Sequence, residues 1–375
     1  MTRPEKRTKR EGTTPPDEPR YEETEAYQQE IASQYTQRVE KFSVAEVARV
    51  LALLNFPEVN LDSIRPASVG NVNATYLTPD LVIKMNQKKG EEDYVANKIV
   101  SDRLAAEKPV VKVLAYDSFE KTPYEVLVME RAKGDLLLKD IFQLTHEQQI
   151  ALYRQVLETI KAMFTIRFDD FGLISKHDQY KTYAEYLTQR FKANIDKIRA
   201  QRLCNENDLT LVESYFLENV KIFEQDTESV FVHTDLHPGN ILHQGDRLTA
   251  LLDFDYSVKA PKMRVLLSLL GFIDKPSQFV EGTGDFQTYK GKTFYHLLPL
   301  LKEELADMFA DPQLLEKLNL HFISEGIMWI SANWSAEWNK QMIRTIVDAE
   351  LPKDKKNLQK SYYGKVLSHL EGGAL

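Results

Sequence analysis

Apolar and polar positions alternate in short runs over the first third of the chain and recur at helical spacing over most of the rest. Residues 62–86 read as a strand, a turn and a second strand, and residues 126–129 are also typical of a strand. A helix is expected at about 91–105, and from residue 145 onward apolar residues recur at helical spacing. The pattern therefore predicts strands in the first third of the chain and mostly helices after it.

Helix starts are marked by a serine or threonine that is followed three residues later by glutamate or glutamine, the capping box. This signature occurs at Ser43, Thr145, Thr182 and Thr210. We therefore expect helices to begin at these positions, the first of them within a helical segment at 26–55.

One stretch carries polar groups at the ends of two predicted strands. Residues 231–255 read FVHTDLHPGNILHQGDRLTALLDFD. A short apolar run leads to Asp235, Asn240 follows five residues later, and the second strand of a predicted hairpin ends on Asp253. Asp, Pro, Gly and Asn together can form a simple turn, but the second aspartate at the end of the hairpin favours a site.

This arrangement suits phosphoryl transfer. That chemistry needs an acceptor hydroxyl held in line with the γ-phosphate, and magnesium to balance the charge. Magnesium prefers oxygen ligands, usually one or two carboxylates together with phosphate oxygens. Asp253 and Asn240 can supply a carboxylate and an amide oxygen, and Asp235 can then orient the hydroxyl and accept its proton.

The run H-T-D-L-H-P-G-N-I-L followed by L-D-F-D resembles the aminoglycoside phosphotransferase family of protein-kinase-like small-molecule kinases. The chain keeps the D-x-x-x-x-N spacing of protein kinases but has Leu-His-Pro-Gly inside the loop and Asp-Phe-Asp in place of Asp-Phe-Gly. The resemblance implies an α+β fold in two lobes. The small lobe would hold a five-stranded antiparallel sheet and a helix, and the larger, mainly helical lobe would carry the catalytic hairpin.

The resemblance also divides the chain. Residues 26–131 would form the nucleotide-binding lobe with its leading helix, and residues 132–375 the lobe that catalyses and binds the acceptor. Residues 1–25 are rich in charged residues, proline and threonine and have almost no large apolar residues. Such a segment is expected to be a disordered tail.

Two further nucleotide contacts are implied on the strands of the small lobe. The turn with Gly70 and Asn73 matches a family turn in which glycine lets backbone N–H groups approach phosphate. Lys84 lies inside an apolar strand and must reach a polar group. The resemblance places Lys84 on the α- and β-phosphates; the competing interpretations are a plain hairpin turn and a solvent-facing lysine.

Residues 124–134 resemble the connector between the lobes, where adenine is bound by backbone groups. The Glu130 carbonyl and the Ala132 N–H are expected to face adenine, with Met129 behind it. An ordinary strand and loop would have the same residue types, so only the position in the chain supports this assignment.

The sequence departs from the family pattern at two places. Asn97 stands near the glutamate that pairs with the strand lysine in protein kinases, and Glu92 lies earlier, so the partner of Lys84 stays open between them. Arg264 stands where relatives often have an aspartate that braces the catalytic loop. Asp255 is a further acidic residue that could assist a second metal or the substrate.

Two other patterns in the sequence allow either a functional or a structural interpretation. Asp170-Phe171-Gly172 spells the kinase metal motif, but it precedes Asp235, so it is interpreted as a loop and Asp253 as the metal aspartate. Aromatic and acidic residues gather near the C-terminus and could form either a wall for a cationic acceptor or helix core, the latter being more common. They are Trp329, Trp334, Trp338, Glu325 and Glu337.

The composition is that of an ordinary globular protein, with 43% hydrophobic and 28% charged residues. The net charge of −8 gives no electrostatic footprint for nucleic acid, and no apolar run is long enough for a membrane span or a signal peptide. The single cysteine, Cys204, excludes an intrachain disulfide and a cysteine metal cluster. We therefore expect a cytoplasmic protein that binds neither nucleic acid nor membrane.

The resulting hypothesis is a phosphotransferase that uses ATP and Mg²⁺ to phosphorylate a hydroxyl of a small molecule. Aminoglycosides, macrolides, choline, homoserine and sugars all remain open as acceptors, as does the oligomeric state. The alternatives are a non-catalytic nucleotide-binding scaffold and a protein kinase. The Leu-His-Pro-Gly loop, the Asp-Phe-Asp and the lack of an evident A-P-E segment argue against the protein kinase.

Overall fold

The structure is a computed structural model. It describes residues 28–29, 32–33, 42–67, 74–87, 92–333, 335–351 and 355–370. The predicted tail, the turn with Gly70 and Asn73, and Trp334 all lie outside the described residues.

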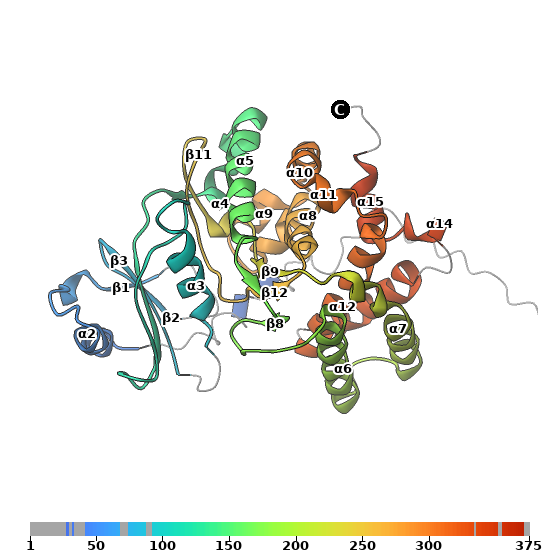
Figure 1. Ribbon diagram of the computed structural model, residues 1–375, viewed down its shortest axis with the longest axis horizontal. Coiled ribbons are helices and arrows are strands. Elements are labelled where there is room, and N and C mark those ends of the chain that lie inside the picture. Colours follow the sequence, from blue (N-terminus) through green and yellow to red (C-terminus); the bar gives the residue numbers. More distant parts are fainter. Residues whose placement is uncertain are drawn as a thin grey trace, which may run out of the picture.

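The smaller lobe is a five-stranded antiparallel sheet in the order β1-β2-β3-β5-β4, with one helix on each side. Figure 1 shows α2 on the outer side and α3 on the side of the larger lobe. This is the small lobe that the sequence predicts. The elements are α2 (Val44–Leu53), β1 (Arg65–Pro66), β2 (Ala74–Leu77), β3 (Leu81–Asn86), α3 (Val95–Leu104), β4 (Val113–Ser118) and β5 (Glu125–Glu130).

The interior strand β5 is buried on both faces, because its alternate side chains enter two different cores. Val126 and Val128 pack with α2, whereas Leu127 and Met129 pack into the core of the larger lobe. Lys84 on β3 is paired with Leu127 in the register. It therefore lies on the face of the sheet that is turned toward the larger lobe.

The larger lobe is mainly helical and contains two small sheets, in the orders β11-β10-β6 and β7-β9-β12-β8. Its strands are β6 (Asp135–Leu136), β7 (Arg167–Phe168), β8 (Gly172–Leu173), β9 (Ser229–Val232), β10 (Ile241–Gln244), β11 (Arg247–Leu251) and β12 (Val258–Ala260). Its helices are α4 (Leu137–Asp140), α5 (His146–Met163), α6 (Tyr183–Gln201), α7 (Glu206–Asn219), α8 (Leu266–Asp274), α9 (Phe286–Tyr289), α10 (Leu298–Glu304), α11 (Ala306–Phe309), α12 (Leu314–Ala332), α13 (Ala336–Thr345), α14 (Lys355–Leu358) and α15 (Tyr362–Ser368).

The two lobes together give the α+β architecture that the sequence predicts. We propose that they divide between residues 131 and 132, because β5 is the last strand of the five-stranded sheet and β6 already pairs with β10. No helix among the described residues is long and apolar enough to cross a membrane.

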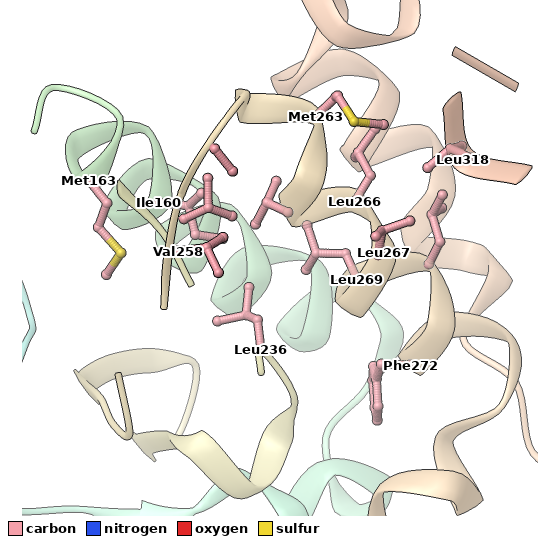
Figure 2. Packing of buried hydrophobic residues seen from close by; sticks show 14 of the residues in the cluster. Ile160, Met163, Leu236, Val258, Met263, Leu266, Leu267, Leu269, Phe272 and Leu318 are labelled. Atoms are coloured by element: carbon pink, nitrogen blue, oxygen red, sulfur yellow. The ribbon is translucent and has the colours of Figure 1, made fainter. Parts of the chain in front are cut away.

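The core of the larger lobe fixes the position of the loop after β9. Leu236 is buried in this core together with Ile160 of α5, Val258 of β12 and Leu269 of α8 (Figure 2). Because Asp235 directly precedes Leu236, the buried leucine holds the backbone of Asp235 at the surface of the core.

Three of the four predicted helix starts are confirmed. The side chains of Ser43, Thr145 and Thr182 cap α2, α5 and α6. The start predicted at Thr210 is wrong, because α7 begins at Glu206 and the side chain of Asn205 accepts a hydrogen bond from the Asn207 N–H at 2.9 Å. An asparagine five residues earlier already caps this helix, so Thr210 lies inside it.

Candidate active site

The hairpin of β10 and β11 brings the predicted polar residues together at its open end. Asn240 immediately precedes β10, and Asp253 follows β11 after one intervening residue. The Leu252 N–H donates to the Asn240 carbonyl oxygen at 2.9 Å, which ties the two ends of the hairpin to each other. Gly245, with φ of +62°, makes the turn at the other end.

Side chains of the loop after β9 attach it to the segment after β11. His233 lies with Nε2 3.1 Å from the Leu252 carbonyl oxygen, and its Nδ1 accepts from the Asp235 N–H at 3.3 Å. Burial lowers the pKa of His233, so its imidazole is neutral and donates from Nε2 alone. The Thr234 hydroxyl donates to the Tyr256 carbonyl oxygen at 2.8 Å.

These bonds brace the loop without the aspartate that relatives often have at the position of Arg264. Arg264 is buried and pairs instead with Glu325 on α12, at 2.9 Å, and Arg190 on α6 lies 3.5 Å from the same carboxylate oxygen. Although Arg264 replaces the expected aspartate, the hydrogen bonds of His233 and Thr234 still attach the loop to the segment after β11.

Asp235 presents an ionised carboxylate to solvent. Its side chain is 43% exposed, and Oδ2 accepts from Asn240 Nδ2 at 3.0 Å. Partial burial acts to raise the pKa of Asp235, but His237, His233 and Asn240 outweigh this effect and lower the pKa to about 2. The carboxylate can therefore accept a hydrogen bond from a hydroxyl group over the whole neutral range.

His237 also belongs to the site, although no role was predicted for it from the sequence. Its Nε2 lies 3.6 Å from Asp235 Oδ1, and its Nδ1 accepts from the Gly239 N–H at 3.1 Å. A Cβ atom on Gly239 would come within 2.6 Å of the imidazole, so glycine is needed there for the histidine to fold over the turn. The sequence signal that could have identified this histidine is the His-Pro-Gly run between Asp235 and Asn240.

Lys84 reaches the same site from the smaller lobe. Its Nζ lies 2.9 Å from Asp253 Oδ1 and 2.8 Å from Asp255 Oδ2. Neither partner that the sequence left open forms this pair: Asn97 donates to Asp255 Oδ1 at 2.7 Å, and Glu92 lies 2.9 Å from His177. The negative charge that pairs with Lys84 comes from Asp253 and Asp255, which follow β11, because the amide of Asn97 carries no charge.

The charges of this cluster balance one another unequally. Burial acts to lower the pKa of Lys84, but the two carboxylates outweigh it and raise the pKa, so the lysine stays cationic. Burial and the charge of Asp253 raise the pKa of Asp255, whereas Lys84 holds the pKa of Asp253 below its usual value despite burial. One cation between two carboxylates leaves an excess of negative charge.

The donor set fits magnesium. Asn240 Nδ2 donates to the main-chain and side-chain oxygens of Asp235, which assigns Oδ1 of the amide as the acceptor atom. Asp253 has a side chain that is 42% exposed and a left-handed φ of +60°, a backbone strain that is common at functional sites. No three His, Cys, Asp or Glu residues gather into a metal cage in the described part of the chain.

The predicted adenine contacts lie at the end of β5. Met129 is buried, and the backbone after it is held by two bonds, from the Glu130 N–H to the Lys112 carbonyl at 2.9 Å and from the Arg131 N–H to the Asp80 carbonyl at 2.8 Å. Ala132 follows directly. The contacts with adenine stay predictions, as do the roles of Gly70 and Asn73.

The two other sequence patterns have structural roles. Asp170 of the Asp-Phe-Gly run pairs with Lys259 at 2.6 Å. The run is not wholly a loop, because Phe171 forms an isolated bridge with Tyr180 and Gly172, with a φ of +136°, begins β8. Glu325 is engaged by two arginines, so the idea that its carboxylate serves a cationic acceptor is wrong. Trp338 packs against the core, whereas Trp329 is exposed.

Comparison with known proteins agrees with this geometry. The model of a family described as the phosphotransferase enzyme family matches residues 63–281, more than half of the chain. The chain belongs to this family. It is therefore a phosphotransferase, and the match spans both lobes and the whole hairpin. Comparison with curated proteins gave no match.

Solved structures of aminoglycoside phosphotransferases share the fold of this phosphotransferase. A thermostable mutant of APH(4)-Ia in the apo form gives a TM-score of 0.53 at 15% identity, over 80% of this chain and 99% of that one. A second mutant of that enzyme, with AMP-PNP and hygromycin B, gives 0.53 at 16%, over 80% and 97%. The streptomycin–ATP complex of APH(2″)-IIa gives 0.50 at 14%, over 80% and 99%. These likenesses confirm the predicted two-lobed fold.

Proposed function

We propose that this phosphotransferase transfers the γ-phosphate of ATP, with Mg²⁺, to a hydroxyl group of a small molecule. One observation carries the proposal. The loop after β9 and the segment after β11 present two partly exposed carboxylates, Asp235 and Asp253, and the ammonium group of Lys84, the lysine of β3, lies 2.9 Å from Asp253. Phosphoryl transfer requires this combination of an acceptor for the hydroxyl proton, a carboxylate for the metal and a cation for the phosphates.

The reaction needs little covalent help from the protein. Lys84 binds the α- and β-phosphates, and Asp235 accepts a hydrogen bond from the acceptor hydroxyl and aligns its oxygen with the γ-phosphorus. The new bond forms between that oxygen and phosphorus, and the bond to the β–γ bridging oxygen breaks, so ADP leaves with the electron pair. A carboxylate with a pKa of about 2 takes the hydroxyl proton late and then passes it to the product phosphate or to water.

Asn240 and Asp253 would hold the metal, since both offer oxygen atoms at the open end of the hairpin. A bound Mg²⁺ supplies neutralisation of the phosphate charge. The excess negative charge around Lys84 supports this assignment, because a cation is needed to balance it before a polyanionic nucleotide can approach.

A coupled assay of ADP release with magnesium-ATP tests the proposal. Wild type, Asp253→Asn and Asp170→Asn are compared with aminoglycosides, macrolides, choline, homoserine and sugars as acceptors. Asp170→Asn is the matched control, because it changes the aspartate of the other Asp-Phe motif, whose partner is Lys259. We expect one class of compound to stimulate ADP release in wild type and in Asp170→Asn, and the stimulation to be lost in Asp253→Asn.

If no compound stimulates release, thermal shift with ATP separates the remaining interpretations. A shift that depends on magnesium leaves a kinase with another acceptor. No shift with or without magnesium contradicts the phosphotransferase mechanism and favours a scaffold without nucleotide.

A further inference from the structure

A lysine that binds phosphates is usually held in place by a carboxylate on the helix of the small lobe. In this chain an amide stands at that position of α3. Asn97 is buried; its Nδ2 donates to Asp255 Oδ1 at 2.7 Å, and its Oδ1 accepts from the Phe254 N–H at 3.4 Å. Both ends of the amide therefore contact the segment that contains Asp253.

Asp255 has both carboxylate oxygens engaged inside the protein. Oδ2 lies 2.8 Å from Lys84 Nζ, Oδ1 accepts from Asn97, and the side chain is only 2% exposed. Asp253 lies at nearly the same distance from Lys84, 2.9 Å, but its side chain is 42% exposed. A metal that bridges protein and phosphates has to meet its ligand at the open side of the site, so the two carboxylates are suited to different tasks.

The helix that carries Asn97 is fixed to the sheet at its start. The buried carboxylate of Glu125 on β5 accepts from the N–H groups of Asp93 and Tyr94, at 3.0 and 2.8 Å, and from Asn86 Nδ2 at 2.6 Å. Asn97 lies in the first turn after these bonds. Its amide is therefore presented to Asp255 from a fixed position.

We propose that Asp255, oriented by Asn97, is the residue that positions Lys84 for the nucleotide phosphates, in place of a glutamate on the helix. Asp253 is then the carboxylate that serves the metal. Asp255 is a positioning residue, because it acts through Lys84 and does not touch the reacting atoms. This inference rests on the proposed function, since it concerns how the nucleotide is bound.

Nucleotide affinity measured with and without metal tests the assignment. Isothermal titration with ADP is done once in EDTA and once in magnesium, on wild type, Asp255→Asn and Asp253→Asn. In EDTA, Asp255→Asn should bind ADP about tenfold more weakly than wild type, the size expected for one lost charged hydrogen bond. Asp253→Asn should bind ADP in EDTA at least as tightly as wild type but lose the gain in affinity that magnesium gives.

Two results would overturn the inference. If Asp255→Asn binds ADP in EDTA as wild type does and only needs more magnesium, Asp255 is a second metal ligand. If wild type binds no nucleotide in either condition, the proposed function fails and this inference fails with it. The first result leaves the proposed function standing, so the two failures are distinguishable.

A double-mutant cycle shows whether Asp255 acts through the lysine. Lys84→Met and Lys84→Met with Asp255→Asn should bind ADP equally, because the carboxylate then has no lysine to position. The double variant should also unfold at a higher temperature than Lys84→Met, since it removes a buried carboxylate that has lost its cation. Additive losses of affinity would contradict the proposed route.

Two further variants guard against a trivial loss of structure. Asn97→Ala should weaken ADP binding in EDTA in the same direction as Asp255→Asn, and it remains informative if Asp255→Asn does not fold. Asp117→Asn is the control, because Asp117 is a buried aspartate of the same sheet that accepts from the Lys121 and Thr122 N–H groups at 2.9 and 3.0 Å. It should lower thermal stability and leave ADP affinity unchanged.

Discussion

Two of the charge clusters among the described residues differ in the sign of their excess charge and in their access to solvent. The phosphate-side cluster has one cation between two carboxylates, and the arginine cluster has one carboxylate between two cations. The first comprises Lys84, Asp253 and Asp255, and the second comprises Arg190, Arg264 and Glu325. Each contains an unbalanced charge, so charge alone does not distinguish a binding site from a structural element.

The surroundings of the two clusters distinguish a binding site from a structural element. The arginine cluster lies against the buried rings of Tyr183, His321 and Tyr363. Burial, with a smaller effect of Arg264 and Arg190, lowers the pKa of His321 far below its usual value, so this ring stays neutral. In the phosphate-side cluster the carboxylate of Asp253 is open on one side. An excess charge with an open side can bind a ligand, whereas an enclosed one ties helices together.

The largest expected effect is a loss of turnover when a carboxylate beside the solvent-open cluster is changed. Asp235→Asn keeps the size of the side chain beside the phosphate-side cluster but removes the acceptor for the hydroxyl proton. Turnover in the ADP-release assay should fall by about 10²–10⁴-fold. The ADP affinity from calorimetry should stay close to wild type, because the residue contacts the acceptor and not the nucleotide. Turnover comparable with wild type would contradict the role of Asp235.

The next largest effect is a loss of stability when the carboxylate of the arginine cluster is removed. Glu325→Leu leaves the buried guanidinium group of Arg264 and the partly buried one of Arg190 without their carboxylate, so the free energy of unfolding should fall by about 3 kcal/mol. Urea denaturation measures this change. Glu337→Leu is the matched control on the neighbouring helix, because its pair with Lys340 is exposed, and it should change stability by less than about 1 kcal/mol. Equal losses in both variants would remove the contrast between an enclosed and an exposed pair.

The smallest effect concerns acid titration of Asp235. A carboxylate whose folded-state pKa is lowered contributes stability that is present above its unfolded pKa and is lost as the pH falls through its folded pKa. For Asp235 that window runs from about 3.8 down to about 2. His237→Gln removes an interaction that lowers the pKa, so the pKa of Asp235 should rise toward 3.8. Carboxyl carbon NMR follows both titrations, and a wild-type midpoint above pH 4 would contradict the local electrostatics.

The spacing of the sequence was sufficient to place the hairpin and its polar ends. Asp235, Asn240 and Asp253 lie where a strand, a tight turn and a second strand must bring them, because a hairpin register leaves little freedom. The lysine of β3 was also predictable, since a charged residue in an apolar strand needs a polar partner.

The partners of that lysine were not predictable, because they depend on how a helix of one lobe faces a loop of the other. Spacing along the helix suggested Glu92 or Asn97, whereas the ammonium group pairs with Asp253 and Asp255, both more than 150 residues away in the chain. The same limit applies to Arg264, whose partner Glu325 lies on a helix that no local pattern relates to it. At Thr210, two local signals competed, and the asparagine at 205 capped the helix first.

The clamp of Glu125 on the start of α3 bears on regulation. In kinases whose lysine partner sits on a movable helix, displacement of that helix separates the ion pair and switches the enzyme off. Here the carboxylate that meets Lys84 belongs to the same short segment as Asp253, and the helix contributes only the amide of Asn97. A shift of α3 would break a neutral donor's bond and leave the ion pair intact. The ion pair of Lys84 therefore depends less on the position of α3 than it would if its carboxylate belonged to that helix.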